Sequence, residues 1–451
     1  MAERQQKFAA DLLITARWVI PVVPEGAVLE NHGIAIKDKR ILEILPITEA
    51  EQKIKAEKVV HLQHHAVIPG LINAHGHAPM SLFRGIADEV PLKEWLEQYI
   101  WPLETQHVDA EFVYQGATLA IAEMLSGGTT CFADMYFFPD AVAKAATNAH
   151  IRVQLASPVL DFPTVWGQNA EEYILKATEL HDDYRNSELV YTAFGPHATY
   201  TVSDAPLRKI SILAEELDIP IHIHLHETAL EVEEAVVNTG KRPLERLAEL
   251  GLISPRLLCV HATQLTDDEM TLLKTSGAHV IHCPESNMKL ASGLCEVGKL
   301  LDKEVNVALG TDGCASNNDL DMFSEMRTAA LLAKAVAGNA STLPAYKALQ
   351  MATINGACAL GLDQHIGSIE IGKFADLTAV RMDSLNALPL YNPVSHLVYN
   401  TQASQVSHVW VGGKTVVHEG KLTTIETRAV QELATHWQHK IMQSQTEVTG
   451  R

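Results

Sequence analysis

The feature that most constrains the fold of this chain is a regular alternation of short apolar runs with longer amphipathic stretches between residues 68 and 361. The runs have the length of buried strands, and the stretches between them carry apolar residues at helical spacing. Eight runs can be counted, at residues 67–73, 129–134, 151–157, 189–194, 220–226, 257–261, 279–282 and 305–309. Eight strand–helix units predict an α/β fold, a (β/α)8 TIM-like barrel rather than an open doubly wound sheet.

The two ends of the chain have a different pattern. Residues 11–22, 33–45 and 376–380 are strand-like, and residues 408–418 predict a hairpin around Gly412-Gly413. Residues 429–442 have helical spacing. We therefore expect a small β-sandwich domain, with a C-terminal helix, built from residues 1–66 and 367–451, and a catalytic barrel over residues 67–366.

Composition narrows the possible partners. Hydrophobic residues make up 47% of the 451 residues and charged residues 20%, which is typical of a folded enzyme. The net charge of -20 repels nucleic acid and anionic lipid surfaces, so neither is an expected partner. The polar N-terminus and the lack of 18 successive apolar residues predict no export signal and no membrane span, and hence a cytoplasmic protein. Six Cys without a CxxC pair indicate reduced thiols.

Histidines follow two of the predicted strands. His75-Gly76-His77 comes directly after the first strand, and residues i and i+2 of an extended chain face the same side. The fifth strand carries His222, His224 and His226, which by the same rule share one face. Active sites of such barrels lie at the C-terminal ends of the strands. The spacing indicates a metal site there, but it leaves open which histidine of the fifth strand takes part.

Two more strand ends add polar groups. His261 ends the sixth strand, and Asp312 follows the eighth in Gly310-Thr311-Asp312-Gly313. Histidines from strands one and five together with Asp312 form a set of three nitrogens and one oxygen that suits zinc and leaves a position for water. We expect one divalent metal ion per subunit, with Zn2+ favoured, although Fe or Mn would fit the same ligands.

These motifs resemble the amidohydrolase superfamily, and the resemblance extends over almost the whole chain. The segments that carry it are Pro69 through His77, His224-x-x-Glu227, Val260-His261-Ala262, Gly310 through Gly313, Ala352 through Ala357 and Gly367 through Leu377. Binuclear members have a carboxylated Lys on strand four, where this chain reads Phe194-Gly195-Pro196-His197. The resemblance therefore implies a mononuclear site.

Within that superfamily the chain most resembles the 5'-methylthioadenosine / S-adenosylhomocysteine deaminases. The motifs are Leu92 through Leu96, Trp101 through Glu104, Gly195 through His197 and His224 through Thr228. The resemblance implies a metal held by His75, His77, His224 and Asp312. It also implies that Trp95, Glu104 and His197, together with Glu227 and Asp312, contact a small purine nucleoside. Glu104 would bind the ribose hydroxyls, and a homo-oligomer is expected from the family.

The expected reaction is zinc-dependent hydrolysis of a 6-aminopurine nucleoside to the inosine analogue and ammonia. Asp312, helped by His261, would take the proton of the attacking water, and Glu227 would protonate the ring nitrogen. The substrates implied are methylthioadenosine, adenosine and, less well, S-adenosylhomocysteine.

The 5' substituent can be argued from charge. A homocysteine carboxylate is usually bound by Arg. Residues 157–188 contain a single Arg, Arg185, and Phe162, Val165 and Trp166 make this stretch apolar. We therefore expect methylthioadenosine to be preferred, unless another loop or Arg84 supplies the cation.

Two other readings stay open. One is another amidohydrolase, such as a guanine or cytosine deaminase or a triazine chlorohydrolase. The substrates of these enzymes have no ribose for Trp95 and Glu104 to contact, which weighs against this reading. The other is a metal-binding protein without catalysis, against which Glu227, His261 and Asp312 weigh.

Overall fold

A parallel sheet forms the core of the computed structural model, which describes residues 7–449. In that range eight strands lie in the order of the sequence, from β5 to β12. Their bounds are Leu71–Asn73, Thr129–Asp134, Arg152–Val159, Val190–Pro196, Ile221–Leu225, Leu257–His261, His279–His282 and Asn306–Leu309. The predicted strand series is confirmed, with shifts of a few residues at the ends.

The sheet closes into a barrel between its first and last strands. The Ala74 N–H donates a hydrogen bond to the Leu309 carbonyl (2.9 Å), and the Asp312 N–H donates one to the His75 carbonyl (3.1 Å). Strands β6 and β7 are buried along their whole length, as expected for strands covered on both faces. The (β/α)8 fold is therefore confirmed, and residues 75 and 312 become neighbours at its seam.

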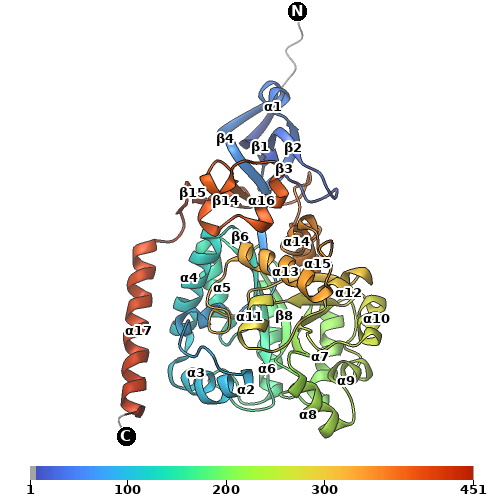
Figure 1. The fold of residues 1–451 in the computed structure, drawn as a ribbon. Coiled ribbons are helices and arrows are strands. Elements are labelled where there is room, and N and C mark those ends of the chain that lie inside the picture. The colour runs from blue at the N-terminus through green and yellow to red at the C-terminus, as the bar shows by residue number, and fades with distance from the viewer. Residues whose placement is uncertain (1–6, 450–451) are drawn as a thin grey trace, which may run out of the picture.

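Helices surround the barrel, as Figure 1 shows. The longer ones are α4 Ala110–Ser126, α5 Pro139–Ala149, α6 Ala170–Tyr184, α7 Asp204–Leu217, α8 Ala229–Thr239, α10 Asp267–Ser276 and α13 Met322–Ala337. Shorter ones are α9 Pro243–Glu249, α11 Pro284–Lys289, α12 Val297–Asp302, α14 Ala345–Met351 and α15 Ile354–Ala359. Their boundaries follow local signals: Thr266 and Glu269 form a capping box on α10, and Gly277 ends it at φ 75°.

A second sheet is built from both ends of the chain and lies above the barrel in Figure 1. Its order is β16-β15-β14-β13-β4-β1-β2-β3. The bounds are β1 Phe8–Val19, β2 Leu29–Lys37, β3 Arg40–Pro46, β4 Ile54–Pro69, β13 Leu377–Arg381, β14 Val406–Val411, β15 Lys414–His418 and β16 Lys421–Leu422. Trp410 of β14 shares a buried cluster with Ile36 of β2, so the sheet curls until its two halves pack face to face.

Two details of the terminal sheet differ from the sequence-based expectation. Residues 33–45 form the hairpin β2–β3 rather than one strand, because Asp38 and Lys39 turn the chain at φ 49° and 71°. The first part of strand β4 was not predicted, since most of its residues before Ala66 are at least partly exposed and give no apolar run. Residues 67–69, predicted as the start of the first barrel strand, instead end β4 and pair with β13 of the terminal sheet. Gly70 alone separates β4 from β5, and a Cβ at Gly70 would lie 2.0 Å from Thr130 Oγ1.

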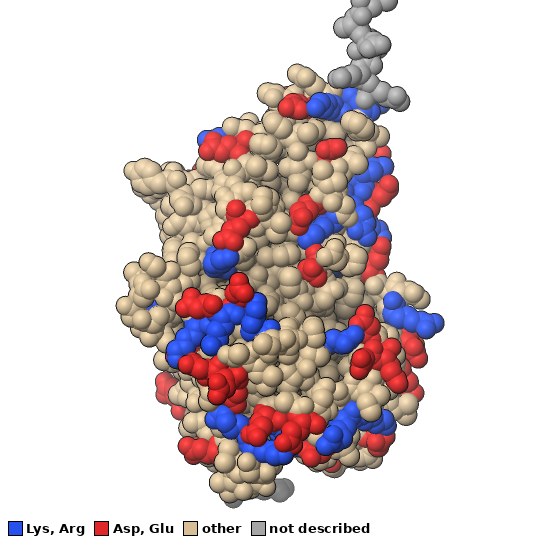
Figure 2. All heavy atoms as spheres, turned by 90° about the vertical axis from the view of Figure 1, so that its right-hand side faces the viewer, with Lys and Arg blue, Asp and Glu red and all other residues tan. Residues whose placement is uncertain are grey.

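The terminal sheet is joined to the barrel by a buried ion pair. Arg152 of β7 binds Asp376 through Nε (2.6 Å) and Nη2 (3.1 Å), and both side chains are almost fully buried. The predicted C-terminal helix is confirmed as α17 Thr427–Thr449, which runs along the barrel beside α4. Figure 2 shows acidic and basic side chains interspersed over one face. No helix within residues 7–449 has the length and apolar character needed to cross a membrane.

Candidate functional site

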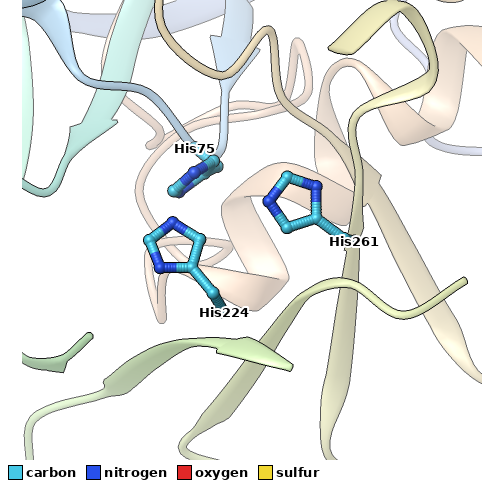
Figure 3. Close-up of side chains that lie close together, drawn as sticks. All are labelled: His75, His224 and His261. Atoms are coloured by element: carbon cyan, nitrogen blue, oxygen red, sulfur yellow. The ribbon is translucent and has the colours of Figure 1, made fainter. Parts of the chain in front are cut away.

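Side chains from four barrel strands converge at the mouth of the barrel. His75 and His77 follow β5, His224 lies in β9, His261 ends β10 and Asp312 follows β12. Figure 3 shows the rings of His75, His224 and His261 directed toward one another. The Nε2 atoms of His75 and His77 lie 3.3 and 3.2 Å from Asp312 Oδ1. Two overlapping groups have ligand atoms within 4.8 Å of one another, His75 with His224 and His261, and His75 with His77 and Asp312.

The outer nitrogens of these rings are already bound, which prepares the inner ones for a metal. Nδ1 of His77 contacts the Met135 carbonyl (2.6 Å), and Nδ1 of His224 contacts the His197 carbonyl (2.8 Å). A carbonyl accepts a hydrogen bond from the Nδ1–H group, so Nε2 of the neutral ring keeps its lone pair, the arrangement typical of zinc-binding histidines. His75 Nε2 is buried without a well-formed hydrogen bond. The donor set therefore fits a divalent ion such as zinc.

Burial favours the neutral ligand form of two of the imidazoles. It lowers the pKa of His75 to about 4 and holds the pKa of His224 well below its ordinary value. The Asp312 carboxylate instead raises the pKa of His77 to about 9, against the effect of burial, so His77 gives up a proton when it binds a metal. Neutral imidazole is the form that binds a metal. His222 lies two residues before His224 on β9 and is buried too. Its Nε2 contacts His75 Nδ1 at 2.8 Å. His222 therefore supports a ring of the site rather than joining it.

His226 does not share the face of His222 and His224, so that prediction was wrong. Strand β9 ends at Leu225, and His226 has a φ of 55°, which turns its side chain out of the barrel. Its Nε2 accepts a hydrogen bond from the Leu244 N–H at 3.0 Å. The alternation rule holds only while the chain stays extended, and one left-handed residue ends it.

Asp312 is held in place from two sides. Its Oδ2 accepts hydrogen bonds from Ser286 Oγ and Ser316 Oγ, both at 2.7 Å, which leaves Oδ1 facing His75 and His77. The residue has a φ of 61°, a conformation that is rare outside glycine and is typical of functional sites.

Glu227 and His261 stand next to each other beside the cluster. Glu227 Oε2 lies 3.8 Å from His261 Nε2, and both side chains are buried. Burial raises the pKa of Glu227, so the carboxyl retains its proton more readily than an exposed one. His261 Nδ1 contacts Asn287 Oδ1 at 2.9 Å, which directs its Nε2 toward Glu227. The pair can hold and transfer protons at the barrel mouth.

The three residues implied as substrate contacts line one cavity of about 250 Å³ together with the metal-facing groups. Trp95 is buried, and its Nε1 has no hydrogen-bond partner among the described residues. Burial raises the pKa of Glu104 to about 7, against the effect of the neighbouring Tyr136 hydroxyl. His197 Nδ1 contacts Thr201 Oγ1 at 3.0 Å, and burial lowers its pKa to about 4. The structure thus brings all of the predicted site residues to one place, with His75 just behind the cavity wall.

The outer wall of this cavity is apolar. The loop after β7 contributes Phe162, Pro163 and Val165, and the segment after β5 contributes Trp101, whose ring lies 6.5 Å from that of Phe162. None of the described side chains that line the cavity is Lys or Arg. Arg84, considered as a source of positive charge, instead pairs with Glu123 and donates to the Asn318 carbonyl.

Several residues of the site were missed by reasoning from sequence. They contact the predicted residues through hydroxyl, amide or carbonyl groups, and they are Met135, Tyr136, Ser286, Asn287, Ser292 and Ser316. For Ser286 and Asn287 a signal existed, because they follow the end of the seventh strand, where barrel sites gather. The same signal existed for Met135 and Tyr136, which directly follow β6. For Ser292 and Ser316 only the fold reveals the contact.

Comparisons with known proteins agree with this geometry. The family model described as the amidohydrolase family matches residues 66–416. The chain is 51% identical to a 5-methylthioadenosine/S-adenosylhomocysteine deaminase of Saccharophagus degradans, with 96% of this chain and 98% of the relative covered. It is 40% identical to a 5'-deoxyadenosine deaminase of Methanosarcina acetivorans, with 94% and 97% covered. A crystal structure of an adenosine deaminase from Xanthomonas campestris with bound zinc superposes with a TM-score of 0.96 at 47% identity, covering 97% and 100%.

Proposed function

This chain belongs to the amidohydrolase family, in the group of the 5-methylthioadenosine/S-adenosylhomocysteine deaminases, and from that premise we propose that it hydrolyses 5'-methylthioadenosine to the inosine analogue and ammonia. It is a hydrolase of C–N bonds in cyclic amidines. The observation that carries the proposal is that His77, His224 and Asp312, with His75 directly behind them, share one cavity with Trp95, Glu104, His197 and Glu227.

The metal site is proposed to consist of His75, His77, His224 and Asp312, which offer three imidazole nitrogens and one carboxylate oxygen. A zinc ion bound there would supply the Lewis acidity that makes a water molecule nucleophilic near neutral pH. The hydrogen bonds from Ser286 and Ser316 to Asp312 Oδ2 orient the carboxylate for this role. His261 also lies close to His75 and His224, so it could contribute to a metal site. We assign it to proton transfer because its Nε2 faces Glu227.

Proton transfer then follows from the positions of three side chains. Water adds to C6 of the purine, and Asp312, with His261 beside it, accepts the proton that the water loses. Glu227 donates a proton to the ring nitrogen next to C6, so that the ring does not carry a negative charge as C6 becomes tetrahedral. Asp312 then passes its proton to the amino group, which leaves as ammonia. The C6 hydroxyl loses its proton to Glu227 as the carbonyl forms, so both residues return to their starting states. Each such step contributes about 10² to 10⁴ in rate.

Substrate orientation is assigned to the walls of the cavity. The Glu104 carboxylate would accept hydrogen bonds from the ribose hydroxyls, and His197 and Trp95 would contact the nucleoside through a neutral imidazole and an indole with a free N–H. The 5' substituent would then meet Phe162 and the other apolar groups of the outer wall. Methylthioadenosine and adenosine fit such a wall, and S-adenosylhomocysteine fits less well because its carboxylate meets no Lys or Arg among the described residues that line it.

The test is the ultraviolet spectrum of zinc-loaded enzyme mixed with methylthioadenosine, with S-adenosylhomocysteine, adenosine and guanine in parallel. The proposal expects a change to an inosine-type spectrum, stoichiometric ammonia, and the highest kcat/KM for methylthioadenosine. Equal or reversed values for S-adenosylhomocysteine would refute the role of the apolar wall. Turnover of guanine or a triazine alone would refute the nucleoside assignment and leave the metal site standing.

We further propose that the partner of this enzyme is a small purine nucleoside, that it works in the cytoplasm and that it forms a homo-oligomer. Size-exclusion chromatography with light scattering of the purified chain tests the last point.

A further inference from the structure

A short segment behind the site, residues 286–292, contacts three of the acid–base groups, although β11 before it contributes none of them. The contacts are hydrogen bonds from Ser286 Oγ to Asp312 Oδ2 (2.7 Å), from His261 Nδ1 to Asn287 Oδ1 (2.9 Å) and from Ser292 Oγ to Glu227 Oε1 (3.1 Å). We propose that this orienting segment is a positioning element that aligns the proton-transfer groups with one another. The proposal rests on the proposed function of these groups.

The orienting segment is itself held rigidly from outside the site. Glu285, directly before it, accepts hydrogen bonds from Ser324 Oγ (2.6 Å) and Thr328 Oγ1 (2.7 Å) of α13. Within it, Lys289 Nζ pairs with Asp88 at 2.6 Å. Side chains borne on a fixed frame hold a geometry that loose loop residues would not.

The orienting segment is followed by Gly293, where the packing leaves no room for a side chain. Gly293 has a φ of 145°, and a Cβ at this position would lie 2.5 Å from Thr263 Oγ1. Thr263 Oγ1 donates to the Glu227 carbonyl at 2.7 Å. The turn after Ser292 is therefore pressed against the same loop that carries Glu227, so the distance between the two side chains is set by the backbone.

The hydrogen bond from Ser292 sets the orientation of the Glu227 carboxyl, which the rotamer of the side chain leaves free. The last torsion of a glutamate is broad, so the plane of the carboxyl is not set by rotamer preference. Among the described residues, Ser292 is the side chain that donates a hydrogen bond to this carboxyl. Without it the carboxyl could rotate away from the ring nitrogen, and small misplacements of a reacting group cost large factors in rate.

Asn287 has the corresponding effect on His261. The amide oxygen of Asn287 accepts a hydrogen bond from the Nδ1–H group, so in the neutral ring Nε2 of His261 carries the lone pair that proton transfer requires. Both members of the pair are buried. The segment thus sets the orientation of one group and the tautomer of the other, and neither Ser292 nor Asn287 lines the cavity.

The test compares Ser292→Ala with Ser292→Thr in the zinc-loaded enzyme, using whichever amino-heterocycle the wild type turns over. Partners of this kind are typically worth about 10- to 100-fold in activity. We expect kcat to fall by about that factor in Ser292→Ala, with KM changed by less than about twofold and zinc content unchanged, and to recover in Ser292→Thr. Ser407→Ala is the matched control, because Ser407 is a buried serine of the terminal sheet that donates to the Ala379 carbonyl.

A double-variant cycle separates positioning from a merely structural role. In a Glu227→Gln background, Ser292→Ala should cost less than about twofold more in kcat, because its effect is transmitted through the missing acid. Asn287→Ala, which acts through His261, should lower kcat in both backgrounds and tests the segment independently if Ser292→Ala does not fold. Wild-type kcat in Ser292→Ala, or the same loss in both backgrounds, would overturn the proposal. A wild type that deaminates no nucleoside would instead overturn the proposed function.

Discussion

Replacing Glu227 by Gln should nearly abolish turnover while leaving zinc bound. The two side chains have the same shape, and a glutamine oxygen could still accept the hydrogen bond from Ser292 Oγ at 3.1 Å. What is lost is the acidic proton. Loss of one general acid costs about 10² to 10⁴ in kcat, which corresponds to about 3 to 5 kcal/mol of activation free energy.

The metal should remain because Glu227 is outside the proposed ligand set. It lies three residues beyond His224, and its closest approach to an imidazole of the cluster is the 3.8 Å contact with His261. Zinc per chain is measured by plasma mass spectrometry, and kcat from the absorbance change of the purine. Glu234→Gln is the control, since it makes the same change at an exposed residue of α8 that pairs with Lys93.

The pH dependence of kcat provides a second test of the Glu227→Gln variant. Burial raises the pKa of Glu227, and the protonated form is the active one, so kcat of the wild type should fall as pH rises through that pKa. The Gln variant should lack this limb of the profile. Near wild-type kcat in Glu227→Gln, or loss of zinc along with activity, would refute the assignment of Glu227 as the acid.

Three further outcomes are expected. Burial raises the pKa of Glu104 to about 7, so folding stability is lost as pH rises through that value. Glu104→Gln should therefore have a higher Tm than wild type at pH 8 but not at pH 4. The same variant should have a higher KM for methylthioadenosine. Arg152→Leu leaves Asp376 buried without its partner and should lower the free energy of unfolding by about 3 to 5 kcal/mol in urea titrations, whereas Arg428→Ala at an exposed pair should change it by less than about 1. Removal of metal by a chelator should abolish ammonia release, and added zinc should restore it; turnover by metal-free enzyme would contradict the site.

Much of the fold could be predicted from local pattern. Strands of a parallel barrel are buried on both faces, so they appear as apolar runs, and β6 and β7 are visible in this way. Strand β4 gave no such signal, because its first part is half exposed and mostly polar. The reversal at Asp38-Lys39 was missed because positive φ at non-glycine residues has no strong mark in a single sequence.

The chemistry of the site was determined by the sequence itself. Its groups stand at strand ends, and the position of a residue relative to the strand that precedes it is a local property, so the sequence alone predicts that His75, His77 and Asp312 lie at the barrel mouth. Only the tertiary structure decided how those groups are oriented. Ser292 and Glu227 are 65 residues apart in the chain, and their contact depends on the closure of the barrel. The outward position of His226 and the lack of Lys or Arg among the described residues of the cavity wall likewise result from backbone turns and from packing between distant loops, which no periodicity records.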